Sequence, residues 1–232
     1  LKTITSYLLC LGFSFPVIAA LAYIWIDIVK PQELAYSVIT GLPLGLIAAL
    51  LTALSYLINN KEKLPKFGAV MALLCFFAAW ITLTTWLADP RILSWDKWDW
   101  AFKVVVFTVF IPFIFQSRTH IECLILAIIF SVSTIAFSAG VKTALGSGGY
   151  GVLAIMGSNN TGLSEGSTLA TVGVMTLPLI HFVYRHSIVF AHTRYFKPII
   201  LAIACTIALA VIGTNARTGL ITGLLLLVIY VM

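Results

Sequence analysis

Long apolar runs separated by short polar segments dominate the chain. About eight of them approach the length of a membrane crossing, near residues 6–28, 37–58, 68–88, 101–116, 121–140, 168–184, 198–213 and 218–232. A helix needs about 20 apolar residues to cross a bilayer. Strands of a membrane barrel would alternate polar and apolar residues, and these runs do not. The pattern therefore predicts an all-α, polytopic integral membrane bundle of about eight transmembrane helices, forming one transmembrane domain over residues 1–232.

The composition agrees with a membrane protein. Hydrophobic residues make up 61% of the chain and charged residues 9%, with a mean hydropathy of +1.07, whereas globular domains carry about 25% charged residues. The four cysteines lie in apolar runs without metal-ligand spacing. The net charge of +6 comes without a basic patch interleaved with aromatic residues outside the spans. We therefore expect the lipid bilayer as a partner, and no nucleic acid.

The basic residues between the runs predict an orientation. One set alternates with the spans and consists of Lys2, Lys61, Lys63, Lys66, Arg118, Arg185, Arg194 and Lys197. The opposite set is smaller and is mixed with acidic residues; its members are Lys30, Arg91, Lys97, Lys103, Lys142 and Arg217. Cytoplasmic loops carry an excess of Lys and Arg. The N-terminus is therefore predicted inside and Arg217 on the outer face.

Arg217 begins the last apolar run, within Gly213-Thr214-Asn215-Ala216-Arg217-Thr218-Gly219. An arginine at the end of a membrane helix can extend its side chain into the headgroup layer and act as an anchor. Its planar guanidinium also suits bidentate binding of phosphate. The residues alone leave the anchor and the anion site as alternatives.

Two further segments are predicted on the outer face. Residues 89–100 hold three tryptophans within six residues, which suits a segment lying at the headgroups. The longest loop, about 141–167, contains a formal G-x-G-x-x-G match at 146–151, but no strand precedes it, so we expect a flexible loop over an outer cavity instead of a dinucleotide site. His181, His186 and His192 lack the spacing of a helical metal pair. We expect no metal and no cofactor.

Several short stretches resemble a known family when taken in their order. They are Tyr23–Ile26, Lys30–Tyr36, Ser94–Trp98, Met175–Leu179 and Asn215–Gly219. They are similar to the O-glycosylation ligases associated with exosortase systems, a branch of the bacterial O-antigen ligase and polymerase superfamily. The chain departs from that pattern at Glu33, where the family often has a basic residue, and at 165–167, where it tends to have an acidic-Asn-Asn motif.

The resemblance implies a glycosyltransferase on the periplasmic or extracellular face of the bacterial inner membrane. Such enzymes transfer a glycan from a polyprenyl-diphosphate carrier to a protein or saccharide acceptor, without a metal and with inversion at the sugar carbon. They have more membrane helices than this chain and a large outer loop with a catalytic histidine. The resemblance therefore implies the N-terminal part of a longer membrane enzyme, whose catalytic base lies beyond Met232.

The implied site binds the leaving diphosphate, whose negative charge grows in the transition state and is stabilised by pre-placed cations. We expect Arg217 to bind it as the first catalytic candidate, followed by Lys103, Arg91 and Lys142. A transporter or flippase component for an anionic lipid-linked or small substrate is the alternative, since glycines and prolines near 41–45 suit broken transporter helices. A scaffold within a membrane assembly is a third possibility.

Overall fold

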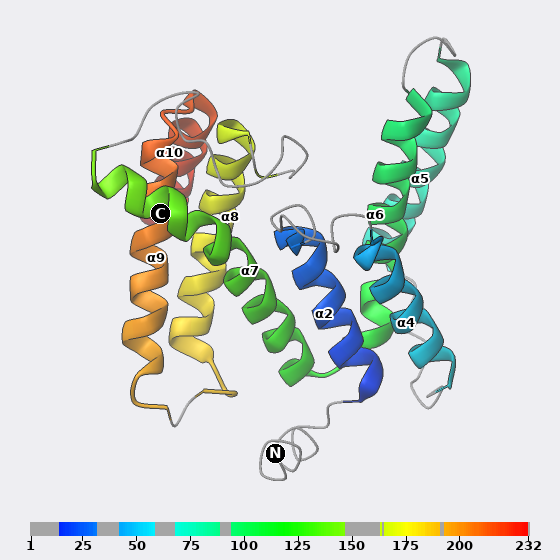
Figure 1. The fold of residues 1–232 in the computed structure, drawn as a ribbon, viewed down its shortest axis with the longest axis horizontal. Coiled ribbons are helices and arrows are strands. Elements are labelled where there is room, and N and C mark those ends of the chain that lie inside the picture. Colours follow the sequence, from blue (N-terminus) through cyan, green and yellow to red (C-terminus); the bar gives the residue numbers. More distant parts are fainter. Residues whose placement is uncertain are drawn as a thin grey trace.

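A computed structural model describes residues 14–31, 42–58, 68–88, 94–146, 163, 165–190 and 193–231. Within these ranges the chain forms eight α-helices and no strands, as the apolar runs predict (Figure 1). The helices are α2 (Phe15–Val29), α4 (Leu44–Ile58), α5 (Ala69–Leu87), α6 (Ser94–Ile114), α7 (Arg118–Ala144), α8 (Gly166–His186), α9 (Phe196–Gly213) and α10 (Arg217–Val231). Consecutive helices run in opposite directions (Figure 1).

The helices have the length and surface of membrane helices. Four of them, α5, α7, α8 and α9, are long and apolar enough to cross a bilayer, and α2, α4 and α10 are shorter apolar helices. In α5 the only buried residue is Met71, and large apolar side chains such as Phe76 and Trp80 are more than half exposed. A soluble protein rarely exposes so continuous an apolar surface, whereas lipid tails solvate it. The chain is an all-α helical membrane protein.

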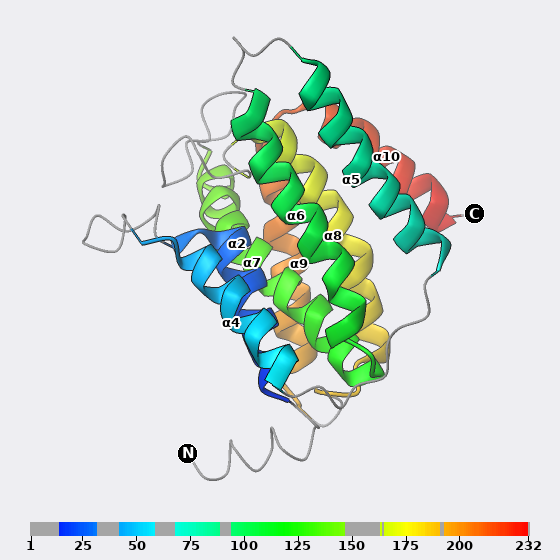
Figure 2. The same cartoon turned by 90° about the vertical axis from the view of Figure 1, so that its right-hand side faces the viewer.

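The helices pack in two groups that α7 and α2 connect. Helices α7, α8 and α9 pack on one another and α10 packs mainly on α8; on the other side α2 packs on α4 and α5 on α6. Helix α7 runs diagonally across the first group and also contacts α2 (Figure 1). Figure 2 views the bundle from the side of α4, α5 and α6, with the helices of the first group behind them. Each group has its own apolar core, one around Ile129, Leu169 and Ile207, the other around Val17 and Ile114.

Small residues allow the helices of the first group to approach closely. A Cβ atom added at Gly140 of α7 would lie 2.5 Å from the carbonyl oxygen of Thr206 in α9. One added at Gly173 of α8 would lie 2.6 Å from a methyl carbon of Val211 in α9. Both distances are shorter than a carbon atom tolerates, so only glycine fits these crossings. Membrane helix interfaces use small residues in this way because van der Waals contact replaces the hydrophobic driving force.

The start of α6 lies upstream of the predicted apolar run. That run begins at 101, but the helix begins at Ser94, so the tryptophans lie in its first two turns. Their position at the headgroups stays a prediction. Trp98 explains the extension, because its indole Nε1 donates a hydrogen bond to Thr82 Oγ1 of α5 at 3.0 Å and its ring stacks on Phe102. Helix α7 is likewise longer than the predicted run 121–140. Its last turn occupies residues 141–144, which were expected to begin the long loop.

Candidate functional site

Arg217 follows a tight turn between two helices. Helix α9 ends at Gly213, and Thr214 and Asn215 reverse the chain before α10 begins. Asn215 adopts a left-handed backbone conformation with φ of 49°, which asparagine tolerates better than most residues. Thr214 Oγ1 donates to the carbonyl oxygen of Val211 at 2.8 Å and accepts from the backbone N–H of Ala216 at 3.3 Å. These bonds fix the direction in which α10 starts.

Two other helices, α7 and α8, contact this turn and the start of α10. A Cβ atom at Gly213 would lie 1.8 Å from Thr143 Oγ1, so the end of α7 touches the end of α9 directly. A Cβ at Gly166, the first residue of α8, would lie 3.6 Å from Thr214 Cβ. A Cβ at Gly219 would lie 2.6 Å from Cβ of Ala170. The two glycines that bracket Arg217 therefore have a packing role, and they bring the end of α7 and the starts of α8 and α10 together.

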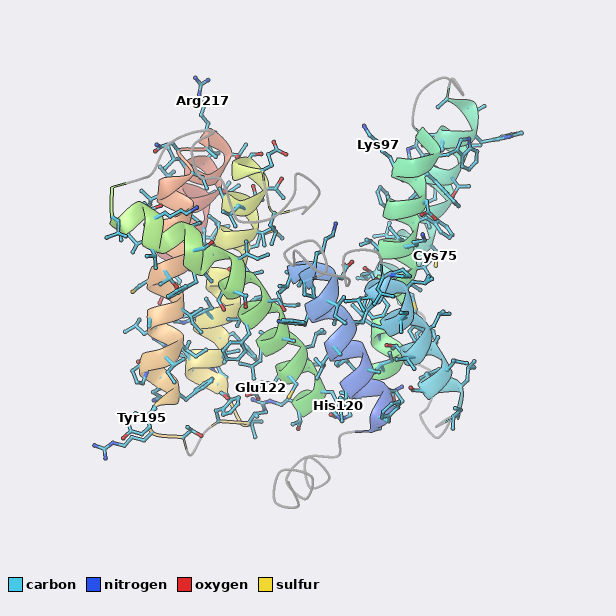
Figure 3. The ribbon with its side chains drawn as sticks, viewed as in Figure 1. Cys75, Lys97, His120, Glu122, Tyr195 and Arg217 are labelled. Carbon is cyan, nitrogen blue, oxygen red and sulfur yellow. The ribbon has the colours of Figure 1, made fainter. Side chains whose placement is uncertain are left out.

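The Arg217 side chain is exposed and points away from the helix ends (Figure 3). Among the residues that the structure describes, no carboxylate forms an ion pair with it. The exposed Glu165 instead accepts hydrogen bonds from Ser167 Oγ at 2.7 Å and Thr168 Oγ1 at 3.5 Å at the start of α8. The half-buried Lys142 lies in the last turn of α7. Lys142 at the end of α7 and Arg217 at the start of α10 therefore lie at the same end of the group formed by α7 to α10.

A separate cleft lies between α2, α4 and α6. Its volume is about 670 Å³. Its walls are mainly apolar, with Ala49 and Leu50 of α4 facing Phe107 and Phe110 of α6. Among the described residues, the polar side chains of its lining are Tyr23, Asp27 and Lys103. Asp27 lies near the end of α2, and Lys103 lies in the first half of α6. The end of α2 and the start of α6 both point toward the end of the bundle at which α10 begins (Figure 1).

Lys103 is held by a neighbour one helical turn away. Its Nζ pairs with Asp99 Oδ2, and both side chains are more than half exposed, at 59% and 56%. Exposed pairs of this kind contribute only about 0–1 kcal/mol, so an anion in the cleft can compete with Asp99 for the lysine. Asp27 was not among the expected site residues. It lies close to the end of the apolar run 6–28, on the same predicted face as Lys103, and this position could have marked it as a candidate.

The expected cations do not converge on one point. Arg217 and Lys142 lie in the group of α7 to α10, whereas Lys103 lines the cleft of the other group, and Figure 1 places α6 and α10 on opposite sides of α2. Arg91, His192 and the glycine-rich residues 147–151 lie outside the described residues. His181 and His186 lie in α8, where they contact the rings of Tyr230 and Phe182.

Comparison with protein families assigns most of the chain to one family. A family described as "Family of unknown function (DUF5935)" matches residues 1–188, well over half of the chain. The chain belongs to DUF5935. No curated protein and no solved structure matches it. The DUF5935 match contains the whole cleft, Lys103 and Lys142, and it ends before Arg217.

The DUF5935 match also contains a buried acidic residue that the sequence did not reveal. Glu122, in the second turn of α7, is only 3% exposed. Its carboxylate accepts hydrogen bonds from Ser187 Oγ and from the backbone N–H groups of Ile188 and Val189, at the start of the connection between α8 and α9. These partners lie 65 to 67 residues away in sequence, so no local sequence pattern indicates them. Figure 3 shows Glu122 at the end opposite Arg217.

Proposed function

We propose that the chain supplies the donor site of a membrane glycosyltransferase of the O-antigen ligase type. In this proposal the donor is a glycan on a polyprenyl-diphosphate carrier, and the acceptor is a hydroxyl of a protein or a saccharide. The observation that supports it best is the cleft between α2, α4 and α6. Its apolar walls suit a polyprenyl chain, and Lys103 suits the diphosphate where that chain ends.

The proposed reaction places specific demands on these residues. The acceptor oxygen attacks the anomeric carbon, the bond from that carbon to the diphosphate oxygen breaks, and the acceptor proton passes to a base. The departing diphosphate gains negative charge as its bond breaks. A cation that is already in place stabilises that charge without having to reorganise. Lys103, in the first half of α6, and Arg217, at the start of α10, are both exposed and are the candidates for this task.

Because the two cations lie in different helix groups, we assign them different contributions. Lys103 lines the cleft, so it would hold the carrier's phosphate while the polyprenyl chain occupies the apolar walls. Arg217 begins α10, where the free N–H groups of the first turn add partial positive charge. Its exposed guanidinium is the candidate for the sugar-side phosphate of the same diphosphate, which leaves with the carrier. We propose that glycan transfer takes place on the outer face of the bacterial inner membrane, because the loop charges predict that the Arg217 end of the bundle faces outward.

Filling the cleft tests the proposal. Binding of a photoreactive polyprenyl diphosphate would be measured on the purified full-length protein in lipid nanodiscs. Ala49→Trp places an indole in the cleft and should abolish labelling. Leu51→Trp is the matched control, because Leu51 belongs to the same helix, is 48% exposed and does not line the cleft. Lys103→Ala should weaken labelling by about tenfold, as expected for the loss of one charge-assisted contact.

Two results would contradict this assignment. Equal labelling of the Ala49→Trp and Leu51→Trp variants would mean that the carrier does not occupy the cleft. Movement of the intact carrier between the leaflets of proteoliposomes, without any transfer to an acceptor, would favour the flippase alternative. The labelled peptide, identified by mass spectrometry, should come from α4 or α6.

A further inference from the structure

The end of the bundle opposite Arg217 contains a second, basic pocket. It has a volume of about 380 Å³ and lies where the last turn of α8 meets the first turn of α9. Three cations line it, Arg185, Arg194 and Lys197, together with the hydroxyls of Ser187 and Thr193. Its walls include the ring of Phe190. Neither the proposed donor site nor the family description assigns any role to this pocket.

The charges of this pocket favour an anion. Among the residues that the structure describes, no carboxylate lines it. Glu122 approaches the connection from α7, but both of its oxygens already accept hydrogen bonds from Ser187, Ile188 or Val189. Lys197 has its Nζ 5.6 Å from the centroid of the Tyr184 ring, a contact that leaves its donors available. Like charges gathered in one hollow raise the local potential and attract an anionic group.

Hydrogen bonds and ring stacking hold the residues of the pocket in place without a ligand. Ser187 Oγ donates to Glu122 and accepts from the backbone N–H of Phe190 at 3.2 Å. The backbone N–H of Thr193 donates to the carbonyl oxygen of Phe190 at 3.0 Å, and the rings of Phe190 and Phe196 stack with centroids 4.7 Å apart. Binding therefore does not require Ser187, Phe190 and Thr193 to be ordered first, which reduces its entropic cost.

The position of the pocket identifies the kind of anion. Both α8 and α9 are long and apolar enough to cross a bilayer, so the pocket at their joined ends lies at the membrane boundary. Around it Tyr195 is 69% exposed, and Ile188 and Ile199 are each 50% exposed. A ligand at this place meets cations at its head and apolar side chains beside it. Basic pockets between membrane helices bind anionic lipid headgroups by this combination.

We propose that this pocket binds the phosphate of an anionic phospholipid, with the acyl chains lying along the exposed apolar side chains of α9. The proposal does not rest on the donor site, which lies at the other end of the bundle. A general attraction between loop cations and an anionic membrane surface is the competing explanation. It differs in its consequence, because every exposed cation at this end would then contribute equally.

The test measures how much anionic lipid stays bound to the protein. The full-length protein would be reconstituted in nanodiscs of phosphatidylcholine and phosphatidylglycerol, and lipids retained on release into the gas phase would be identified by native mass spectrometry. The double variant Arg185→Gln/Lys197→Gln should retain phosphatidylglycerol about tenfold less. Arg118→Gln is the matched control, because Arg118 is an exposed cation at the same end that does not line the pocket. It should retain as much as the wild type.

Three further arms keep the result interpretable. The charge-conserving variant Arg185→Lys/Lys197→Arg should retain the lipid, which separates lost charge from lost folding. Equal losses in the Arg118→Gln control, or equal retention of phosphatidylcholine by the wild type, would overturn the proposal. Inorganic phosphate added in lipid-free detergent should not raise the unfolding midpoint. If it did so, and the Gln variant abolished the effect, the site would bind a soluble anion and the lipid assignment would be wrong.

Discussion

Glu122 should be the most sensitive single position for stability at the end opposite Arg217. Its carboxylate accepts from three donors on the connection between α8 and α9, with the backbone N–H of Ile188 at 3.0 and 2.9 Å from the two oxygens and that of Val189 at 3.1 Å. The residue itself lies in the second turn of α7, so it joins elements that are distant in sequence. Removing the carboxylate leaves three donors without their acceptor.

The expected loss follows from these bonds. A hydrogen bond to a charged group contributes about 1.5–3 kcal/mol, and a buried donor left unsatisfied costs about 1–3 kcal/mol. Water can reach part of the connection, since Ile188 is half exposed, so the full sum should not appear. We expect Glu122→Ala to lower the free energy of unfolding by about 3–5 kcal/mol, in the range for breaking a buried charged contact. Glu122→Gln keeps one acceptor oxygen and should lose about 2 kcal/mol.

The assay is reversible unfolding in mixed micelles with increasing SDS, followed by circular dichroism. Glu165→Ala is the matched control, because Glu165 is an exposed carboxylate that also accepts from nearby hydroxyls, and it should change the free energy by less than about 0.5 kcal/mol. In a background without the native cysteines, Val189→Cys should become more reactive when Glu122 is replaced. A Glu122→Ala protein as stable as the Glu165→Ala control would refute the reasoning.

Three other expectations follow from the helix packing and the proposed site. Gly213→Ala should destabilise the protein by about 1–3 kcal/mol, as overpacking does, whereas Gly45→Ala should not, since a Cβ there meets nothing within 4 Å; equal unfolding midpoints would contradict the close contact. Cysteines replacing Lys97 and Tyr195, at opposite ends in Figure 3, should label oppositely in intact cells, with only position 97 reached by an impermeant thiol reagent; the reverse would place Arg217 inside. Arg217→Lys should slow transfer about ten- to a hundredfold while insertion is unchanged, because lysine lacks the planar fork; unchanged transfer would leave Arg217 as an anchor.

The number and approximate position of the helices could be read from the sequence because membrane helices need long, uninterrupted apolar runs. Helix α5 shows this best, since the run predicted over 68–88 matches Ala69–Leu87. The prediction failed where charge interrupts a helix: Lys97 and Asp99 concealed the first two turns of α6. Those turns are anchored by Trp98 on Thr82 of the neighbouring helix, a contact that no apolar run records.

The arrangement of the helices, and hence the sites, was decided by tertiary structure alone. A membrane helix is apolar on nearly every face, so its hydrophobic pattern does not reveal which face meets a neighbour. The sequence identified Arg217 and Lys103 as candidate ligands, but only the packing separated them into two helix groups and gave Lys103 a cleft. Glu122 gave no local signal, because its partners lie more than sixty residues away and become neighbours only when α7 packs against α8 and α9.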